Sequence, residues 1–187
     1  LRGSDQAGLF VAVSGADVRC VRVASSDHVS GQKSGDGFYA ALGGRIALVA
    51  GCTASGNDRA GVYLESSAAA GCVVNGAFDG NGVVGAYLKS PQGRSTVLSA
   101  ARNDRFGVIM KQAASGWTFG TVTLTGDPAA ANASATGLEL YGCTGNTFRS
   151  VVVRSMSGYG VALAKGDLGA PGASGNTFMS IDCDGSG

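Results

Sequence analysis

A short block that begins with glycine recurs seven times along the chain of 187 residues and constrains the fold more than any other feature. The blocks read GLFVAV, GFYAAL, GVYLES, GAYLKS, GVIMKQ, GLELYG and GVALAK, and begin at Gly8, Gly37, Gly61, Gly85, Gly107, Gly137 and Gly160. The glycines lie 22 to 30 residues apart, a period typical of solenoids, in which each repeat forms one coil. Segments between the blocks, such as VRCVRV and TVTLT, are rich in β-branched residues and favour strands over helices.

Within each block, every second residue is apolar at the same phase. The two inward columns are expected to hold Leu9, Phe38, Val62, Ala86, Val108, Leu138 and Val161, then Val11, Ala40, Leu64, Leu88, Met110, Leu140 and Leu163. This alternation predicts stacked parallel strands that bury one face. Further strands are indicated near residues 46–49, 72–74, 96–98 and 151–153. The sequence therefore predicts an all-β parallel β-helix of about seven coils with three short strands each, as a single domain spanning residues 1–187.

Asparagine recurs four residues before the block glycine, at Asn57, Asn81 and Asn103, where stacked turns could hydrogen-bond from coil to coil. The phrases GNTFRSV and GNTFMSI, at residues 145–151 and 175–181, repeat a second turn. With the blocks, these features resemble the pectate-lyase-like superfamily over essentially the whole chain. The resemblance implies a right-handed parallel β-helix. That superfamily includes polysaccharide lyases, glycoside hydrolases, uronan epimerases, phage tailspikes and adhesins, so fold alone leaves function open.

Composition and charge exclude several classes of partner. The 14 basic and 13 acidic residues are scattered and form no basic stripe, so no nucleic acid is expected as a partner. No apolar stretch is long enough to span a bilayer, so no membrane partner is expected either. Solenoids need polar caps, and neither end shows an amphipathic helix. We therefore expect a fragment of a longer protein that lacks its caps, or ends covered by neighbouring chains.

The cysteines show no pairing or spacing typical of a metal site, so buried free thiols are expected and neither a metal nor a cofactor is predicted. They are Cys20, Cys52, Cys72, Cys143 and Cys183.

The outward positions of the block strands should form two rows along the solenoid axis. The first row is Phe10, Tyr39, Tyr63, Tyr87, Ile109, Glu139 and Ala162, and the second is Ala12, Ala41, Glu65, Lys89, Lys111, Tyr141 and Ala164. Exposed aromatic rings stack on sugar faces, but an aromatic row also stabilises a sheet simply by stacking. The sequence leaves both interpretations of the tyrosines open.

The second row places two lysines side by side. Glu65 can pair with Lys89, but Lys111 then has no acidic neighbour in its column. Like charges on adjacent strands are destabilising unless an anion offsets them, and a carboxylated or sulfated polysaccharide would do so. Solvated rim charges are the plainer interpretation of both lysines.

Lysines and tyrosines on one face are also the groups that β-elimination or C5 epimerisation of a uronan requires. Proximity of two ammonium groups favours proton loss by one, so Lys111 is a candidate base, with Lys89 neutralising the substrate carboxylate and Tyr87 or Tyr63 as acid. The remaining candidate substrate-binding residues are Tyr39, Tyr63, Glu65, Arg59, Arg105 and Tyr141. Both arginines belong to the phrase NDR, where an ion pair within the turn is the alternative role.

Other catalytic arrangements are less well supported. Ordinary glycoside hydrolysis needs two neighbouring carboxylates, and the outer rows offer only Glu65 and Glu139, three coils apart. The single histidine, His28, lies next to Asp27 in an extended connection, where adjacent side chains point apart. Long connections at 25–36, 127–136 and 165–175 could wall a groove.

The sequence thus predicts an extracellular or cell-surface module that binds an acidic polysaccharide along an outer strand face, with cleavage or epimerisation as its candidate reactions. The alternative is a noncatalytic shaft of the tailspike or adhesin type, for which a homotrimer is expected.

Overall fold

A computed structural model describes residues 1–29, 35–127, 135–165 and 172–184. These residues form a parallel β-solenoid, which confirms the predicted fold class, and they contain no helix that could cross a bilayer. The seven blocks form seven strands, but the chain completes about six turns rather than about seven. The three long connections predicted as walls lie in part outside the described residues.

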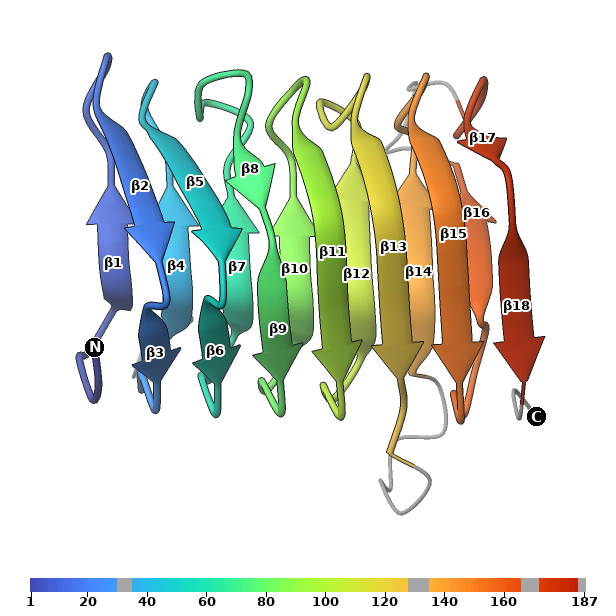
Figure 1. The fold of residues 1–187 in the computed structure, drawn as a ribbon, viewed down its shortest axis with the longest axis horizontal. Coiled ribbons are helices and arrows are strands. Elements are labelled where there is room, and N and C mark those ends of the chain that lie inside the picture. The colour runs from blue at the N-terminus through green and yellow to red at the C-terminus, as the bar shows by residue number, and fades with distance from the viewer. Residues whose placement is uncertain (30–34, 128–134, 166–171, 185–187) are drawn as a thin grey trace.

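One sheet contains all seven block strands, paired in parallel from one end of the solenoid to the other (Figure 1). These are β1 (Ala7–Val11), β4 (Asp36–Ala40), β7 (Ala60–Leu64), β10 (Val84–Leu88), β12 (Phe106–Lys111), β14 (Thr136–Tyr141) and β16 (Val161–Ala164). The register sets Tyr63 opposite both Tyr39 and Tyr87, so equivalent positions of successive blocks align.

The second sheet contains the remaining strands, whose lengths change along the solenoid axis. Its strands are β2 (Asp17–Val21), β3 (Ala24–Ser26), β5 (Arg45–Ala50), β6 (Thr53–Ser55), β8 (Val73–Val74), β9 (Gly76–Asp79), β11 (Arg94–Ala101), β13 (Thr118–Thr125), β15 (Thr147–Arg154), β17 (Thr177–Phe178) and β18 (Ile181–Asp184). The first three coils have the predicted three strands. In the next three, β11, β13 and β15 each run unbroken through the positions of two earlier strands.

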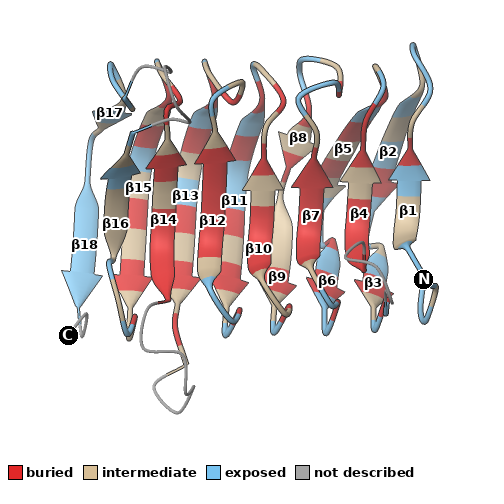
Figure 2. Ribbon diagram, turned by 180° about the vertical axis from the view of Figure 1, so that it is seen from behind, coloured by how far each residue is buried: buried red, intermediate tan, exposed pale blue. Residues whose placement is uncertain are grey.

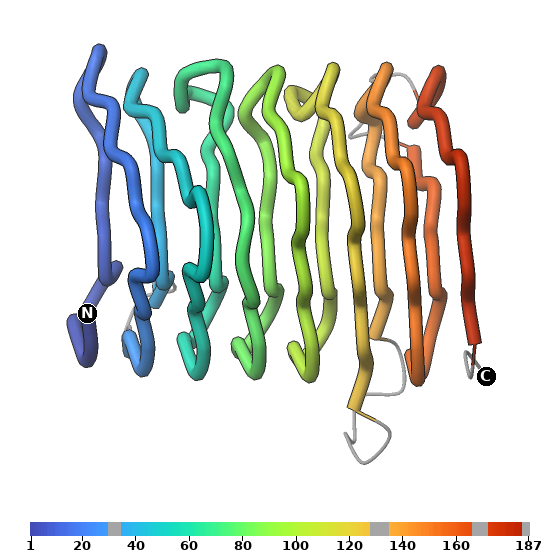
Figure 3. The backbone as a smooth tube through the Cα atoms, in the orientation of Figure 1, coloured from blue at the N-terminus to red at the C-terminus, as the bar shows by residue number. Residues whose placement is uncertain are grey.

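The two sheets form opposite walls of the solenoid. In Figure 1 the second sheet faces the viewer with its strands pointing down, while the block strands point up behind it; Figure 2 shows the reverse face. The continuous trace in Figure 3 advances from the N-terminus to the C-terminus as a right-handed helix.

The inward columns are buried between the two walls, and the central block strands are coloured mostly as buried in Figure 2. Phe38, Leu64, Leu88 and Leu140 are fully buried, as the alternation predicts. Leu163, the last member of its column, is 62% exposed because the described residues place no strand beyond β16. Four aromatic rings stack inside the later coils, namely Trp117, Phe119, Phe148 and Phe178.

The block glycine is required by the close approach of successive coils. A Cβ added at Gly61 would lie 2.7 Å from the carbonyl oxygen of Gly85 and 2.8 Å from Cβ of Phe78. Both distances are too short for real contacts, and the obstacle is backbone rather than the end of a flexible side chain. This crowding explains why the repeat begins with glycine.

Asparagines join the coils at the turns, as predicted. The backbone N–H and the side-chain amide of Asn57 both donate to Oδ1 of Asn81 at 3.2 and 2.8 Å, and Asn81 donates likewise to Asn103 at 2.9 Å. A second ladder, in which Asn146 donates twice to Asn176, occupies the turn of the repeated GNTF phrase. Each ladder satisfies buried turn amides that would otherwise be costly to leave unpaired.

Candidate functional site

The outer face of the seven-stranded sheet carries the two predicted rows. Ring-bearing residues Phe10, Tyr39, Tyr63 and Tyr87 are consecutive partners in the register, followed by Ile109. In the second row, Lys111 lies opposite Tyr141 on the neighbouring strand. The structure therefore brings the predicted outer-face residues of the central coils onto one surface.

The tyrosine row is stacked on itself. Ring centroids are 4.9 Å apart for Phe10 and Tyr39 and 4.7 Å apart for Tyr63 and Tyr87, while Tyr39 meets Tyr63 edge-on at 5.3 Å. Tyr63 is only 8% exposed, and its burial raises the pKa of its hydroxyl. Tyr39 and Tyr87 are half-buried. Of the three tyrosines, Tyr63 has the least surface to offer a sugar.

Arg59 covers the centre of this row. Its guanidinium carbon lies 4.0 Å from the ring centroid of Tyr63, a cation–π contact. Its Nε donates at 2.8 Å to Asp36, and Nη2 donates to the other oxygen of the same carboxylate. The predicted ion pair within the NDR turn is therefore wrong at Arg59, whose partner is Asp36 of β4.

Asp36 is a buried carboxylate that the sequence does not single out. Its side chain has no exposed surface, and burial raises its pKa to about 6, against the opposing effect of the Arg59 guanidinium. Because substrate cannot reach it, Asp36 positions Arg59 rather than acting on a ligand.

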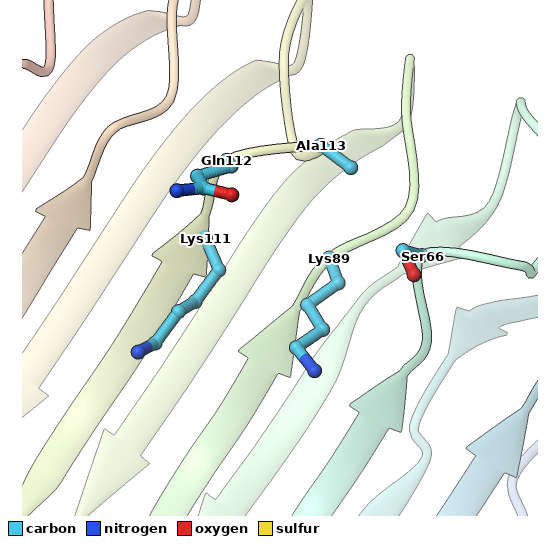
Figure 4. Close-up of a pocket in the computed structure, with 5 residues that line it drawn as sticks. All are labelled: Ser66, Lys89, Lys111, Gln112 and Ala113. Atoms are coloured by element: carbon cyan, nitrogen blue, oxygen red, sulfur yellow. The ribbon is translucent and has the colours of Figure 1, made fainter. Parts of the chain in front are cut away.

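The second row holds the cations expected to meet an anion. Lys89 Nζ lies 3.7 Å from Glu65 Oε2, which confirms that predicted pair, and 5.5 Å from the ring centroid of Tyr87. Lys111 Nζ lies 4.0 Å above the ring of Tyr141. Figure 4 shows the two lysine side chains diverging from neighbouring strands. Each ammonium group therefore has its own partner within the protein, and the two lysines do not extend toward each other as expected.

A hollow of about 220 Å³ opens beside these lysines at the ends of β10 and β12 (Figure 4). Ser66 and Gln112 contribute hydrogen-bonding groups to its lining, which Ala113 completes. Both polar residues directly follow second-row positions in their blocks. Extending the repeat by one residue would therefore have predicted them from the sequence. Among the described residues, no carboxylate forms an ion pair with Lys111.

Arg105 lies at the opposite end of the block strands. It is exposed and lines a second hollow, of about 510 Å³, together with Arg59 and Tyr87. The structure thus separates the predicted arginine and lysine contacts into two places on one face.

His28 has a structural role. Its Nδ1 accepts from the Ser4 backbone N–H at 3.0 Å, its Nε2 is 2.9 Å from Ser25 Oγ, and its backbone N–H donates to Asn57. The ring is buried against these groups, and burial lowers its pKa. His28 therefore begins the asparagine ladder instead of pairing with Asp27. In the part of the chain that the structure describes, no cluster of three or more potential metal ligands occurs.

The fold and this face define the chain as a parallel β-solenoid with aromatic and cationic rows on one outer wall. No family model, curated protein or solved structure matches it.

Proposed function

We propose that the outer face of the seven-stranded sheet binds an acidic polysaccharide, with the hollow at Lys89 and Lys111 as the main contact. The observation that carries the proposal is the environment of Lys111. Its ammonium group rests on the Tyr141 ring and has no ion-pair partner among the described residues, at the edge of a hollow that a second lysine also lines.

The chemistry of the hollow suits a carboxylated or sulfated sugar. An anionic group can accept a charge-assisted hydrogen bond from the Lys111 ammonium group, and Lys89 adds a second positive charge to the same hollow. Ser66 and Gln112 can hydrogen-bond sugar hydroxyls, and the exposed part of Tyr141 offers an apolar surface. The solenoid architecture is compatible with the resemblance to the pectate-lyase-like superfamily, which we retain as part of the proposal.

Cleavage or epimerisation is a narrower form of the same proposal. Lys111 would serve as the base, Lys89 would neutralise the substrate carboxylate, and Tyr87 would supply the acid. Support for these roles is positional: Tyr87 precedes Lys89 by two residues on the same outer face, and Lys111 projects from the adjacent strand.

The test is calorimetric titration with polygalacturonate, a sulfated glycan and a neutral glucan, together with the absorbance of unsaturated uronate products. We expect the acidic chains to bind and the neutral chain not to. Lys111→Ala should weaken binding at least about tenfold, because a hydrogen bond to a charged group contributes about 1.5–3 kcal/mol. Arg149→Ala, an exposed arginine on the opposite sheet, is the matched control. Equal affinity of both variants and the wild type would overturn the proposal, and product formation would establish a lyase.

A noncatalytic shaft is the second candidate, and the burial of Tyr63 favours it. The tyrosine row already has partners within the protein, as expected if its purpose is to stiffen the wall. Light scattering that shows a trimer, with no binding to any glycan, would favour this function.

A further inference from the structure

The second hollow, at the start of the block strands, is large enough for a sugar unit. Its volume of about 510 Å³ falls within the range of small-molecule sites. Val83 and the ring of Tyr87 provide apolar surface, and Arg59, Arg105 and Asp58 are the charged residues of the lining. An apolar surface with a few charged groups is the usual composition of a ligand site.

Arg105 is the cation of this hollow that remains available to a ligand. Arg59 is held by Asp36, and Asp58, which also lines the hollow, has a partner of its own. Arg105 is exposed and forms no ion pair within the described residues. Its guanidinium group can present a two-pronged donor to a carboxylate or sulfate.

Strand β10 connects this hollow to the one at the lysines. Val84 and Tyr87 line the first hollow, and Lys89, the residue directly after β10, lines the second. Lys89 Nζ lies 5.5 Å from the Tyr87 ring centroid, so the aromatic ring and the lysine ammonium group are neighbours on this face. At about 3.3 Å per residue, Val84 and Lys89 are separated by about 16 Å along the strand.

We infer that the two hollows are the ends of one binding track along β10, which holds an acidic oligosaccharide parallel to the strands. One anionic group contacts Arg105, the sugar chain crosses Tyr87, and another anionic group contacts Lys89 and Lys111. The ligand therefore lies parallel to β10, perpendicular to the row of tyrosines that follows the solenoid axis. This inference rests on the proposed function, because it extends the lysine hollow to a second contact.

Calorimetry with the galacturonate monomer, trimer and hexamer tests the track. Joining two contacts in one ligand makes the second contact intramolecular, so affinity should rise steeply once the oligomer spans both hollows. We expect Arg105→Ala to weaken hexamer binding about tenfold and to leave monomer binding at the lysine hollow unchanged. Lys111→Ala should weaken binding of all three ligands, and Arg149→Ala should affect none.

The outcomes distinguish failure of the binding track from failure of the lysine site. If the wild type binds uronates and Lys111→Ala weakens that binding, but Arg105→Ala has no effect on the hexamer, the track is wrong and the lysine site stands. If Lys111→Ala has no effect on any ligand, the proposed function fails first. The conservative variant Arg105→Lys should retain part of the hexamer affinity that Arg105→Ala loses, since it keeps the charge but not the two-pronged donor.

Discussion

Two aromatic rows, one inside the solenoid and one outside, have nearly the same stacking geometry. Phe119 and Phe148 stack inside with centroids 4.6 Å apart, and Tyr63 and Tyr87 stack outside at 4.7 Å. Both distances follow from the spacing of neighbouring strands, about 4.8 Å, once equivalent positions align. Stacked rings on a solenoid are therefore a consequence of register and do not by themselves indicate a ligand site.

What distinguishes the outer row is its charged surroundings. Arg59 lies over Tyr63, and Lys89 Nζ lies 5.8 Å from the ring centroid of Tyr63 and 5.5 Å from that of Tyr87. The inner row contacts apolar neighbours, apart from the indole N–H of Trp117, which donates to the Ser90 carbonyl at 2.7 Å. The functional signal of the outer wall thus lies in the cations beside the rings.

The largest effect should come from the inner row. Phe148→Ala removes a fully buried ring that stacks on two others, and we expect it to lower the free energy of unfolding by about 3–5 kcal/mol. Denaturant titration measures the loss, with Phe148→Leu as a control that keeps most of the volume. A loss below about 1 kcal/mol would show that the inner stack contributes little to stability.

The same truncation in the outer row should cost less. Tyr63→Ala loses a mostly buried ring and its stacking on Tyr87, for an expected loss of about 2–3 kcal/mol. Tyr63→Phe keeps the ring and its stacking on Tyr87, and should cost no more than about 1 kcal/mol. Equal losses for Tyr63→Ala and Phe148→Ala would contradict the difference between the rows.

The outer row should also respond to pH through Asp36. Its pKa is raised by burial from 3.8 to about 6, so the folded protein binds this proton more tightly than the unfolded chain does. Its contribution to stability is therefore fully present below the unfolded pKa of 3.8 and is lost as the pH rises to about 6, by about 3 kcal/mol. Denaturant titrations across this range should show that slope in the wild type but not in Asp36→Asn. Parallel pH profiles would rule out the raised pKa.

The smallest effect on stability should come from the Glu65–Lys89 pair. Glu65→Gln should change the free energy of unfolding by about 0–1 kcal/mol, because the pair is partly exposed. It also removes the carboxylate that competes for Lys89, so polygalacturonate should bind a few-fold more tightly. Glu139→Gln, farther along the outer rows, is the control. Weaker binding by Glu65→Gln would indicate that Glu65 itself contacts the ligand.

Much of the architecture could be predicted because each repeat obeys the same physical constraints as the last. The alternation at Phe38, Leu64 and Leu88 assigns an inward face, and the glycine phase aligns the coils, so the outer rows and the Glu65–Lys89 pair follow. The unbroken β11 was not predicted, because it depends on whether a turn interrupts the second wall. The resemblance to the pectate-lyase-like superfamily indicated several possible functions, both catalytic and structural, and did not distinguish among them.

The sequence by itself determined which residues of the seven block strands align, since period-two alternation and a glycine that tolerates close backbone approach fix their register. Only the tertiary structure decided which partners Arg59 and Lys111 take on the outer wall. Arg59 reaches back to Asp36 on an earlier strand, and Lys111 turns toward the ring of Tyr141. Long flexible side chains select their partners from whatever the folded surface places within reach, and no local pattern in the sequence encodes that choice.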